Sequence, residues 1–118
     1  MWLRQPRPAT TKAVLQRIPV WVEAVRKHGG DVVFVRMPIS GSLKRLTEQT
    51  YPDRDHWIQV LAARNITVID FAKEPTLSMF NCPDESHLDA DDAERFSAAL
   101  AGILKDRKLV TGGEAGPQ

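Results

Sequence analysis

Hydrophobic residues recur at helical spacing in three stretches of the chain, with polar residues between them. The first stretch starts near Thr10 and Thr11, both typical helix N-cap residues, and stops at Gly29-Gly30. Pro19 lies inside this stretch, so it either kinks the helix or begins a second one. The apolar face of this predicted helix is formed by Val14, Ile18, Trp21, Val22 and Val25.

Two further helices are predicted in the second half of the chain. One opens at Pro52-Asp53 and ends at Asn65, and the other is capped by Asp89. Because Trp21 and Trp57 both fall on apolar helix faces, we expect them to pack in the core. The two apolar faces are Trp57, Ile58, Val60, Leu61 and Ala62 in the first helix, and Phe96, Ala99, Leu100, Ile103 and Leu104 in the second.

Two short apolar runs have the β-branched composition of buried strands. The first run, Val32 to Met37, lies between Gly29-Gly30 and Pro38, and the second run is Ile66 to Phe71. Residues 39–49 are expected to form a connection, and residues 72–83 a loop.

The predicted order of helix, strand, helix, strand and helix is typical of a parallel sheet with flanking helices. Two strands alone leave both sheet edges open and cannot cover three amphipathic helices. We therefore expect an incomplete α/β domain over residues 12–110, of the flavodoxin-like three-layer type. An irregular segment is expected at residues 1–11 and a flexible tail at residues 111–118. Either the chain contains further strands that the pattern does not reveal, or a second copy of the chain or a sequence absent from it completes the sheet, and we favour the absent sequence.

Composition restricts the function classes only broadly. The chain has 118 residues, of which 42% are hydrophobic and 26% charged, and its formal net charge is +1. A disordered chain, a nucleic-acid binder and a membrane-spanning protein are therefore not expected. Cys82 is the only cysteine, which excludes an intrachain disulfide and a CxxC site. The first eleven residues lack the apolar core of a signal peptide, and nothing in the sequence indicates a compartment.

The segment from Cys82 to Asp89 carries the strongest candidate chemistry, because it follows a strand and loop and precedes a helix. Asp84 and His87 are three residues apart, so their side chains can meet within one turn of chain. The carboxylate would accept a hydrogen bond from one ring nitrogen, and the other nitrogen could then take a proton from a hydroxyl nucleophile. The simpler alternative is that both residues only cap the helix and lie on the surface.

This segment also resembles a known family. Asp84-Glu85-Ser86-His87-Leu88 and the helix that follows, with Phe96 on its inner face, closely resemble the last conserved block of the SGNH (GDSL-like) hydrolase superfamily. The two predicted strands fit the strands that precede this block, so the resemblance covers about residues 12–105, although only Asp-x-x-His-Leu is a motif. It implies a three-layer sandwich fold and a serine esterase or acyl-transfer hydrolase.

Within that resemblance, Asp84 corresponds to the triad carboxylate and His87 to the general base. It implies no cofactor, and its substrate would be an ester- or acyl-bearing small molecule or polymer. SGNH enzymes place a nucleophilic serine in a Gly-Asp-Ser-like block and oxyanion-hole Gly and Asn residues in later blocks, and this sequence has none of these blocks. We therefore expect the C-terminal part of such a hydrolase, or a degenerate relative, with little esterase activity of its own.

The remaining serines offer weaker candidates for chemistry. Ser40 and Ser42 follow the first strand, on the side of the sheet where substrates bind, so a substrate contact is one hypothesis for this loop. Hydroxyl groups that bond their own backbone are the simpler interpretation, because this loop lacks the Gly-x-Ser-x-Gly elbow. Ser86 lies between Asp84 and His87 and is expected to point elsewhere.

Two other interpretations concern metal binding and a non-catalytic role. Asp84, Glu85, His87 and Asp89 could ligate a cation, but a single local histidine and the capping role of the carboxylates argue against a metal site. Cys82 is expected to be a partly buried apolar residue. The alternative function is a non-catalytic α/β interaction module that completes its sheet by homo-oligomerisation. A flavodoxin-like ligand-binding domain has less support, because no phosphate loop is present.

Overall fold

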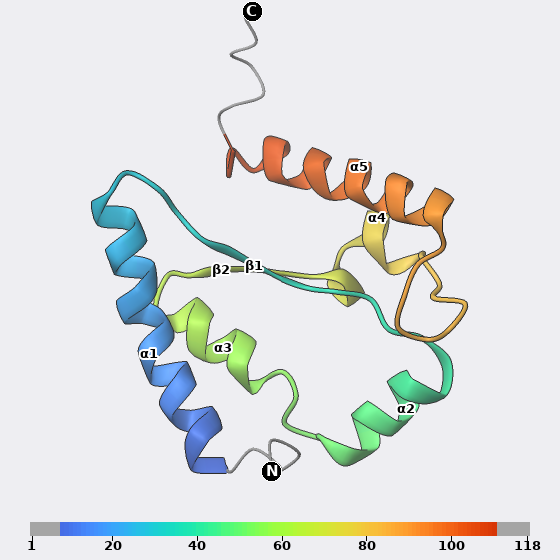
Figure 1. Cartoon of the computed structure of the whole chain (residues 1–118), viewed down its shortest axis with the longest axis horizontal. Helices are drawn as coiled ribbons and strands as arrows, with labels where there is room; N and C mark the ends of the chain where they lie inside the picture. The colour runs from blue at the N-terminus through green and yellow to red at the C-terminus, as the bar shows by residue number, and fades with distance from the viewer. Residues whose placement is uncertain (1–7, 111–118) are drawn as a thin grey trace, which may run out of the picture. The chain divides into compact units, whose positions relative to one another are not determined.

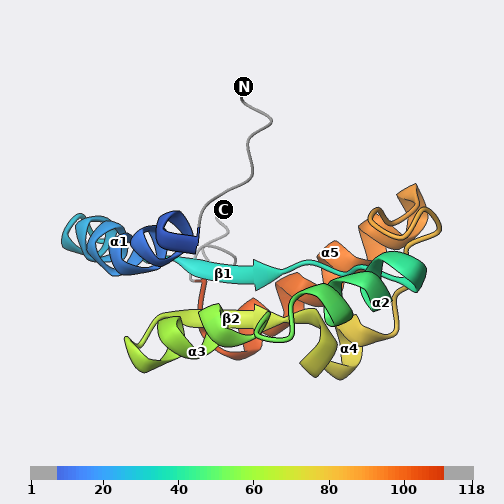
Figure 2. The same ribbon diagram turned by 90° about the horizontal axis from the view of Figure 1, so that it is seen from below.

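The computed structural model describes residues 8–110, in which helices alternate with two short strands (Figure 1). The elements are α1 (Pro8–Lys27), β1 (Val33–Arg36), α2 (Gly41–Thr50), α3 (His56–Ala63), β2 (Thr67–Asp70), the 3-10 helix η1 (Phe71–Lys73), α4 (Pro75–Ser78) and α5 (Ala90–Asp106). The two strands pair in parallel, as their arrows in Figure 2 show. The described part is therefore mixed α/β as predicted, with a two-stranded sheet.

The chain divides into two compact units. Among the described residues, the first unit contains residues 8–34 and 53–68, and the second contains residues 35–52 and 69–110. Each strand contributes its first two residues to the first unit and its last two to the second. The candidate chemistry of the Asp84 segment therefore belongs to the second unit.

In the first unit, α1 and α3 pack against each other (Figure 1). The buried centre consists of Val22, Leu61 and Ile66, and Trp57 packs against it as predicted. Asn65 has a positive φ of 61°, and Arg26 donates to its carbonyl oxygen at 3.0 Å. A left-handed residue directly after a helix is a common way to end it, so the predicted stop at Asn65 has a local backbone cause.

The predicted core face of α1 is only partly correct. Trp21 is 52% exposed, and Val14 and Val25 are also exposed, whereas Val22 is buried. At 1.5 Å per residue, the eight residues of α3 span about 12 Å, whereas the twenty residues of α1 span about 30 Å. Helix α3 is thus too short to cover the whole apolar face of α1. The helix continues through Pro19, so this proline does not begin a second helix.

The second unit contains helices that the sequence analysis did not predict. Helix α2 occupies most of the stretch expected to be a connection, and η1 and α4 lie in the expected loop. Ser40 at the N-cap of α2 makes no side-chain capping bond, so the usual local signal for a helix start is missing. The short helices do have local causes. The Asp70 carboxylate accepts from the backbone N–H of Ala72 in η1, and Pro75 occupies the first turn of α4.

The core of the second unit is formed by residues of β2, η1, α4 and α5 and of the segment between α4 and α5. Its buried hydrophobic residues are Ile69, Phe71, Leu77, Cys82 and Phe96. The Phe80 and Phe96 rings meet edge to face with their centroids 5.5 Å apart. Asp89 caps α5 as predicted, accepting from the backbone N–H of Asp92 at 2.8 Å.

Some expectations concern the ends of the chain. Residues 1–7, which include Trp2, and the tail at 111–118 lie outside the described residues. Residues 8–11, which were expected to be irregular, belong to α1. Among the described residues, no helix combines the length and the apolar character needed to cross a bilayer.

Candidate functional site

Asp84 and His87 are in direct contact in the segment between α4 and α5. The Asp84 Oδ2 atom lies 2.9 Å from His87 Nδ1. The other carboxylate oxygen, Oδ1, accepts from the backbone N–H groups of Ser86 at 3.1 Å and His87 at 2.6 Å. These two backbone bonds, together with the His87 ring, lower the pKa of Asp84 below its ordinary value. Asp84 is therefore a charged acceptor at neutral pH that fixes the orientation of the imidazole.

The imidazole of His87 is open to solvent. The side chains of His87 and Asp84 are 78% and 61% exposed. When Nδ1 carries the proton toward Asp84, Nε2 is left with an unprotonated lone pair. No hydrogen bond to Nε2 is present among the described residues. The ring can thus accept a proton from a group that approaches from solvent.

Ser86 does not point away from the histidine, so that prediction is wrong. Its hydroxyl oxygen lies 3.0 Å from Nδ1 of His87, because the turn around Asp84 brings the two neighbouring side chains together. This is the nitrogen that Asp84 also contacts. A nucleophile activated by His87 must instead face Nε2. The geometry therefore makes Ser86 a second polar neighbour of the ring and does not place it as the attacking hydroxyl.

Glu85 anchors this turn to the start of α2. Its carboxylate accepts from the backbone N–H groups of Ser42 at 3.1 Å and Leu43 at 3.0 Å, and its carbonyl oxygen accepts from Ser40 N–H at 2.9 Å. A carboxylate at a helix N-terminus satisfies unpaired N–H groups and suits the helix dipole. Glu85 itself has a positive φ of 75°, which is uncommon for a residue with a side chain. The sequence analysis considered Glu85 only as a metal ligand and missed this role.

Gly41 makes the close approach of Glu85 possible. Its φ is +61°, and a Cβ atom at this position would lie 2.7 Å from the Glu85 Oε2 atom. Both the backbone conformation and the lack of space for a side chain therefore favour glycine at this helix start. No local pattern in the sequence indicates this contact, because Glu85 is more than forty residues away from Gly41.

Ser40 and Ser42 have structural hydrogen bonds. The Ser40 hydroxyl oxygen accepts from Cys82 N–H at 2.9 Å, and the Ser42 oxygen accepts from the Arg45 guanidinium at 3.2 Å. Cys82 is buried, with its thiol directed to the carbonyl oxygen of Pro38 at 3.5 Å. Ser40 and Cys82 thus join the segment after β1 to the segment before Asp84. A substrate contact by Ser40 or Ser42 stays a prediction.

A cleft of ≈ 370 Å³, which we call the strand-end cleft, lies where both strands end. Residues 39–41 follow β1, and residues 71–72 follow β2. Ligands of open α/β sheets bind at the carboxyl ends of the strands. The described residues that line it are Ile39, Ser40, Gly41, Lys44, Phe71, Ala72, Ser78, Met79, Phe80 and Asn81. The cleft is joined to the Asp84 segment through Asn81 and the neighbouring bond between Cys82 and Ser40.

An ion pair links the ends of the two strands. The Arg36 guanidinium donates to Asp70 Oδ2 at 3.0 Å, and the Asp70 side chain is only 5% exposed. The other Asp70 oxygen accepts from Ala72 N–H at 3.1 Å. Sequence reasoning missed this pair, although a charged residue at the end of each apolar strand was the available signal.

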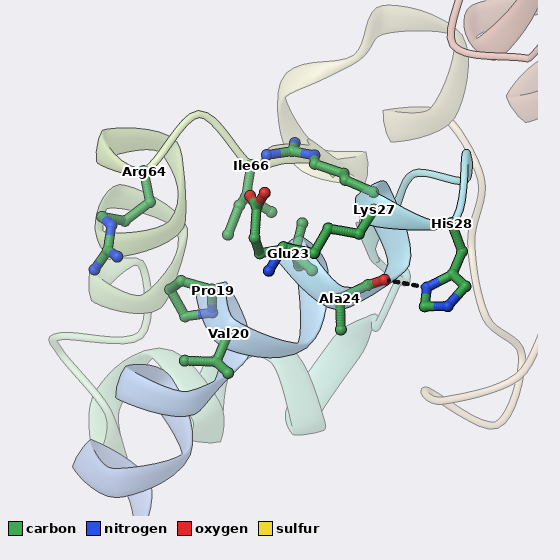
Figure 3. Close-up of a pocket in the computed structure, with 10 residues that line it drawn as sticks. Pro19, Val20, Glu23, Ala24, Lys27, His28, Arg64 and Ile66 are labelled. Carbon is green, nitrogen blue, oxygen red and sulfur yellow. Dashed lines mark hydrogen bonds between the residues drawn. The ribbon is translucent and has the colours of Figure 1, made fainter.

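The first unit has a groove of its own, of ≈ 530 Å³, between the end of α1 and the segment after α3 (Figure 3). His28 lies at its edge, with Nδ1 2.9 Å from the carbonyl oxygen of Ala24. The positively charged side chains that line this groove all have structural roles. Arg26 bonds Asp31 and a backbone carbonyl, while Lys27 and Arg64 stand at helix ends that favour positive charge. This groove therefore offers weaker evidence for a ligand than the strand-end cleft.

Neither a metal cluster among the described residues nor a match to a known protein accompanies the Asp84 segment. Across residues 8–110, no three His, Cys, Asp or Glu side chains gather in a way that could hold a metal ion. A comparison of the chain with family models, curated proteins and solved structures found no match in any of the three. The resemblance to SGNH hydrolases thus has the sequence observations alone behind it.

Proposed function

We propose that Asp84 and His87 are the orienting carboxylate and the general base of an ester or acyl-transfer hydrolase site of the SGNH type. The observation that supports this proposal is the contact of 2.9 Å between Asp84 Oδ2 and His87 Nδ1, with Nε2 of the same ring open to solvent. In such a site the base takes a proton from a hydroxyl nucleophile and later gives it to the leaving group. Asp84 holds the tautomer in which Nε2 can do this.

The finer fold assignment belongs to the same proposal. A three-layer sandwich needs more strands than the two found in the described part of the chain, so further strands would come from another polypeptide segment or another copy. The position of the strand-end cleft beside the Asp84 segment supports this assignment, since parallel sheets bind ligands at that edge.

The nucleophile of the proposed site is not one of the serines of this chain. The chain has five serines, Ser40, Ser42, Ser78, Ser86 and Ser97. None of them forms a hydrogen bond to Nε2 of His87 in the structure. The chain by itself is therefore expected to turn over esters only slowly, with no covalent acyl-serine intermediate.

Hydrolysis of p-nitrophenyl acetate by the purified chain tests the missing nucleophile. We expect little turnover by the unmodified chain, and little change in His87→Ala. His56→Ala is the matched control, because His56 is another exposed histidine, located at the start of α3. Robust turnover that disappears in His87→Ala but persists in His56→Ala would show that the chain does contain a nucleophile.

The base itself is tested by supplying a nucleophile. With 2,2,2-trifluoroethanol added at low concentration, the unmodified chain is expected to accelerate acyl transfer from p-nitrophenyl acetate to the alcohol. His87→Ala should lose this acceleration. Asp84→Asn should lose most of it, because an amide no longer enforces the productive tautomer. Equal rates for the unmodified chain and His87→Ala would refute the assignment of His87 as a base.

A second candidate function is a non-catalytic module that associates with copies of itself. The observation that favours it is the number of large hydrophobic residues left exposed. Four of them, Val14, Val20, Trp21 and Val25, lie on α1. Val14, Trp21 and Val25 recur at helical spacing and so share one face of α1, and an exposed apolar face is typical of interaction surfaces. Sedimentation velocity should then show a dimer or larger species that Trp21→Glu dissociates, and a monomer at all concentrations would exclude this function.

A further inference from the structure

The charge of the strand-end cleft comes from one residue. Among the described residues that line it, Lys44 is the only one with a charged side chain. Its ammonium group lies 3.5 Å from the Glu48 carboxylate one helical turn away, and the two side chains are 46% and 40% exposed. An exposed pair of this kind contributes little stability, so Lys44 can turn toward a ligand at small cost. The nearby Glu85 carboxylate is already engaged by two backbone N–H groups of α2.

The cleft also contains a buried hydroxyl group with a proton to donate. Ser40 is only 9% exposed, and its oxygen accepts from the backbone of Cys82. No described residue accepts the Ser40 hydroxyl proton in return. Ser78 and Asn81 add further polar groups to the lining. A ligand with acceptor oxygens would therefore find a positive charge and several hydrogen-bond donors.

The size and the remaining lining restrict the apolar part of such a ligand. A volume of ≈ 370 Å³ is at the small end of the range for ligand sites. Ile39, Phe71 and Phe80 supply apolar walls. A small organic acid with a short apolar chain fits this volume, with its chain beside these walls and its charge at Lys44.

We propose that the strand-end cleft binds a short-chain carboxylate, with the anion held by Lys44 and the Ser40 hydroxyl. This inference deepens and rests on the proposed function, since such an acid is the product of hydrolysing a short-chain ester. It names short-chain acyl esters as the substrate class and places their acyl group in the cleft.

Binding is measured without catalysis, by titrating the isotope-labelled full chain with sodium butyrate in ¹H–¹⁵N NMR spectra at constant ionic strength. Saturable shifts are expected at the amides of Ser40, Gly41, Ala72 and Asn81, with a dissociation constant on the order of millimolar for so small a ligand. Butyramide has nearly the same shape but no charge, and it should bind at least about fivefold more weakly.

Two lysine variants separate the cleft from general attraction of anions. Lys44→Gln should weaken butyrate binding about five- to tenfold, whereas Lys73→Gln, which removes an exposed lysine outside the lining, should not change it. Equal weakening by both variants, equal binding of butyramide, or shifts scattered over the chain would each overturn the inference. If butyrate binds as expected but acyl transfer does not depend on His87, the hydrolase proposal fails while the carboxylate site stands.

Discussion

The contact between Gly41 and Glu85 leads to a quantitative prediction about what holds the Asp84 segment in place. Replacing Gly41 by alanine puts a Cβ atom 2.7 Å from Glu85 Oε2, so the carboxylate must move away. The positive φ of 61° costs an alanine about 1–2 kcal/mol. Displacing Glu85 also removes the cap of α2, which is worth about 0.5–2 kcal/mol. Gly41→Ala should therefore destabilise the chain by about 1.5–4 kcal/mol.

The free energy of unfolding from urea titration, followed by far-UV circular dichroism, measures this loss. Gly29→Ala is the matched control, because Gly29 has a similar positive φ of 87° but nothing within 4 Å of an added Cβ atom. It should cost only the backbone term of about 1–2 kcal/mol. The difference between the two variants then reports the displaced carboxylate.

The double variant Gly41→Ala/Glu85→Ala makes the test sharper. If the clash acts through Glu85, the two substitutions share one effect, and their combined cost is smaller than the sum of the single costs. NMR signals of His87 should also change in both single variants, because the turn that carries the imidazole loses its anchor. The reasoning is refuted if Gly41→Ala costs no more than Gly29→Ala, or if the costs of Gly41→Ala and Glu85→Ala simply add.

Three further outcomes follow from burial and charge. Trp57→Ala should destabilise the chain by up to about 3–5 kcal/mol, because Trp57 packs against the core of the first unit. The exposed Trp21 should tolerate replacement by alanine with a loss of no more than about 1 kcal/mol. Equal losses of stability in thermal unfolding would contradict this difference in packing. Asp70→Ala removes the buried carboxylate that accepts from Arg36 and from the Ala72 N–H, so it should cost about 3–5 kcal/mol in urea unfolding; an unchanged stability would contradict a stabilising role of this carboxylate. The pKa of Asp84 is lowered in the folded chain, so its stabilising contribution is present above its ordinary pKa of about 3.9 and is lost as the pH falls through the lower folded value. In a pH titration followed by the NMR signal of the Asp84 carboxyl carbon, the midpoint should lie below the ordinary value, and a midpoint above it would contradict the lowered pKa.

How far sequence reasoning reached depends on the distance between interacting residues. The Asp84–His87 contact was predictable, because a separation of three residues lets the two side chains meet whatever surrounds them. The same turn also brings Ser86 to Nδ1, which reasoning from spacing alone assigned wrongly. Spacing fixes which side chains are neighbours but not which ring atom each of them contacts.

The sequence pattern could predict neither how much of the apolar face of α1 is buried nor where α2 begins. The apolar positions of α1 show a full core face, but whether Trp21 is covered depends on the length of the partner helix α3. Helix α2 has no capping side chain of its own, because its cap comes from Glu85, 42 and 43 residues away from the two amides that it accepts from. A capping residue this far away along the chain cannot be recognised from the residues around the helix start.

By itself, the sequence determined the α/β class, the two strands, the cap of α5 and the nearness of Asp84 to His87, since each follows from interactions within a few residues. Only the tertiary structure decided that Glu85 fastens this pair to α2, that Arg36 and Asp70 join the strand ends, and that a cleft with Lys44 in its wall opens there. The physical reason is chain connectivity. Local hydrogen bonds and hydrophobic periodicity depend on residues that are close in the sequence. A site assembled from three separate segments forms only when packing brings those segments together.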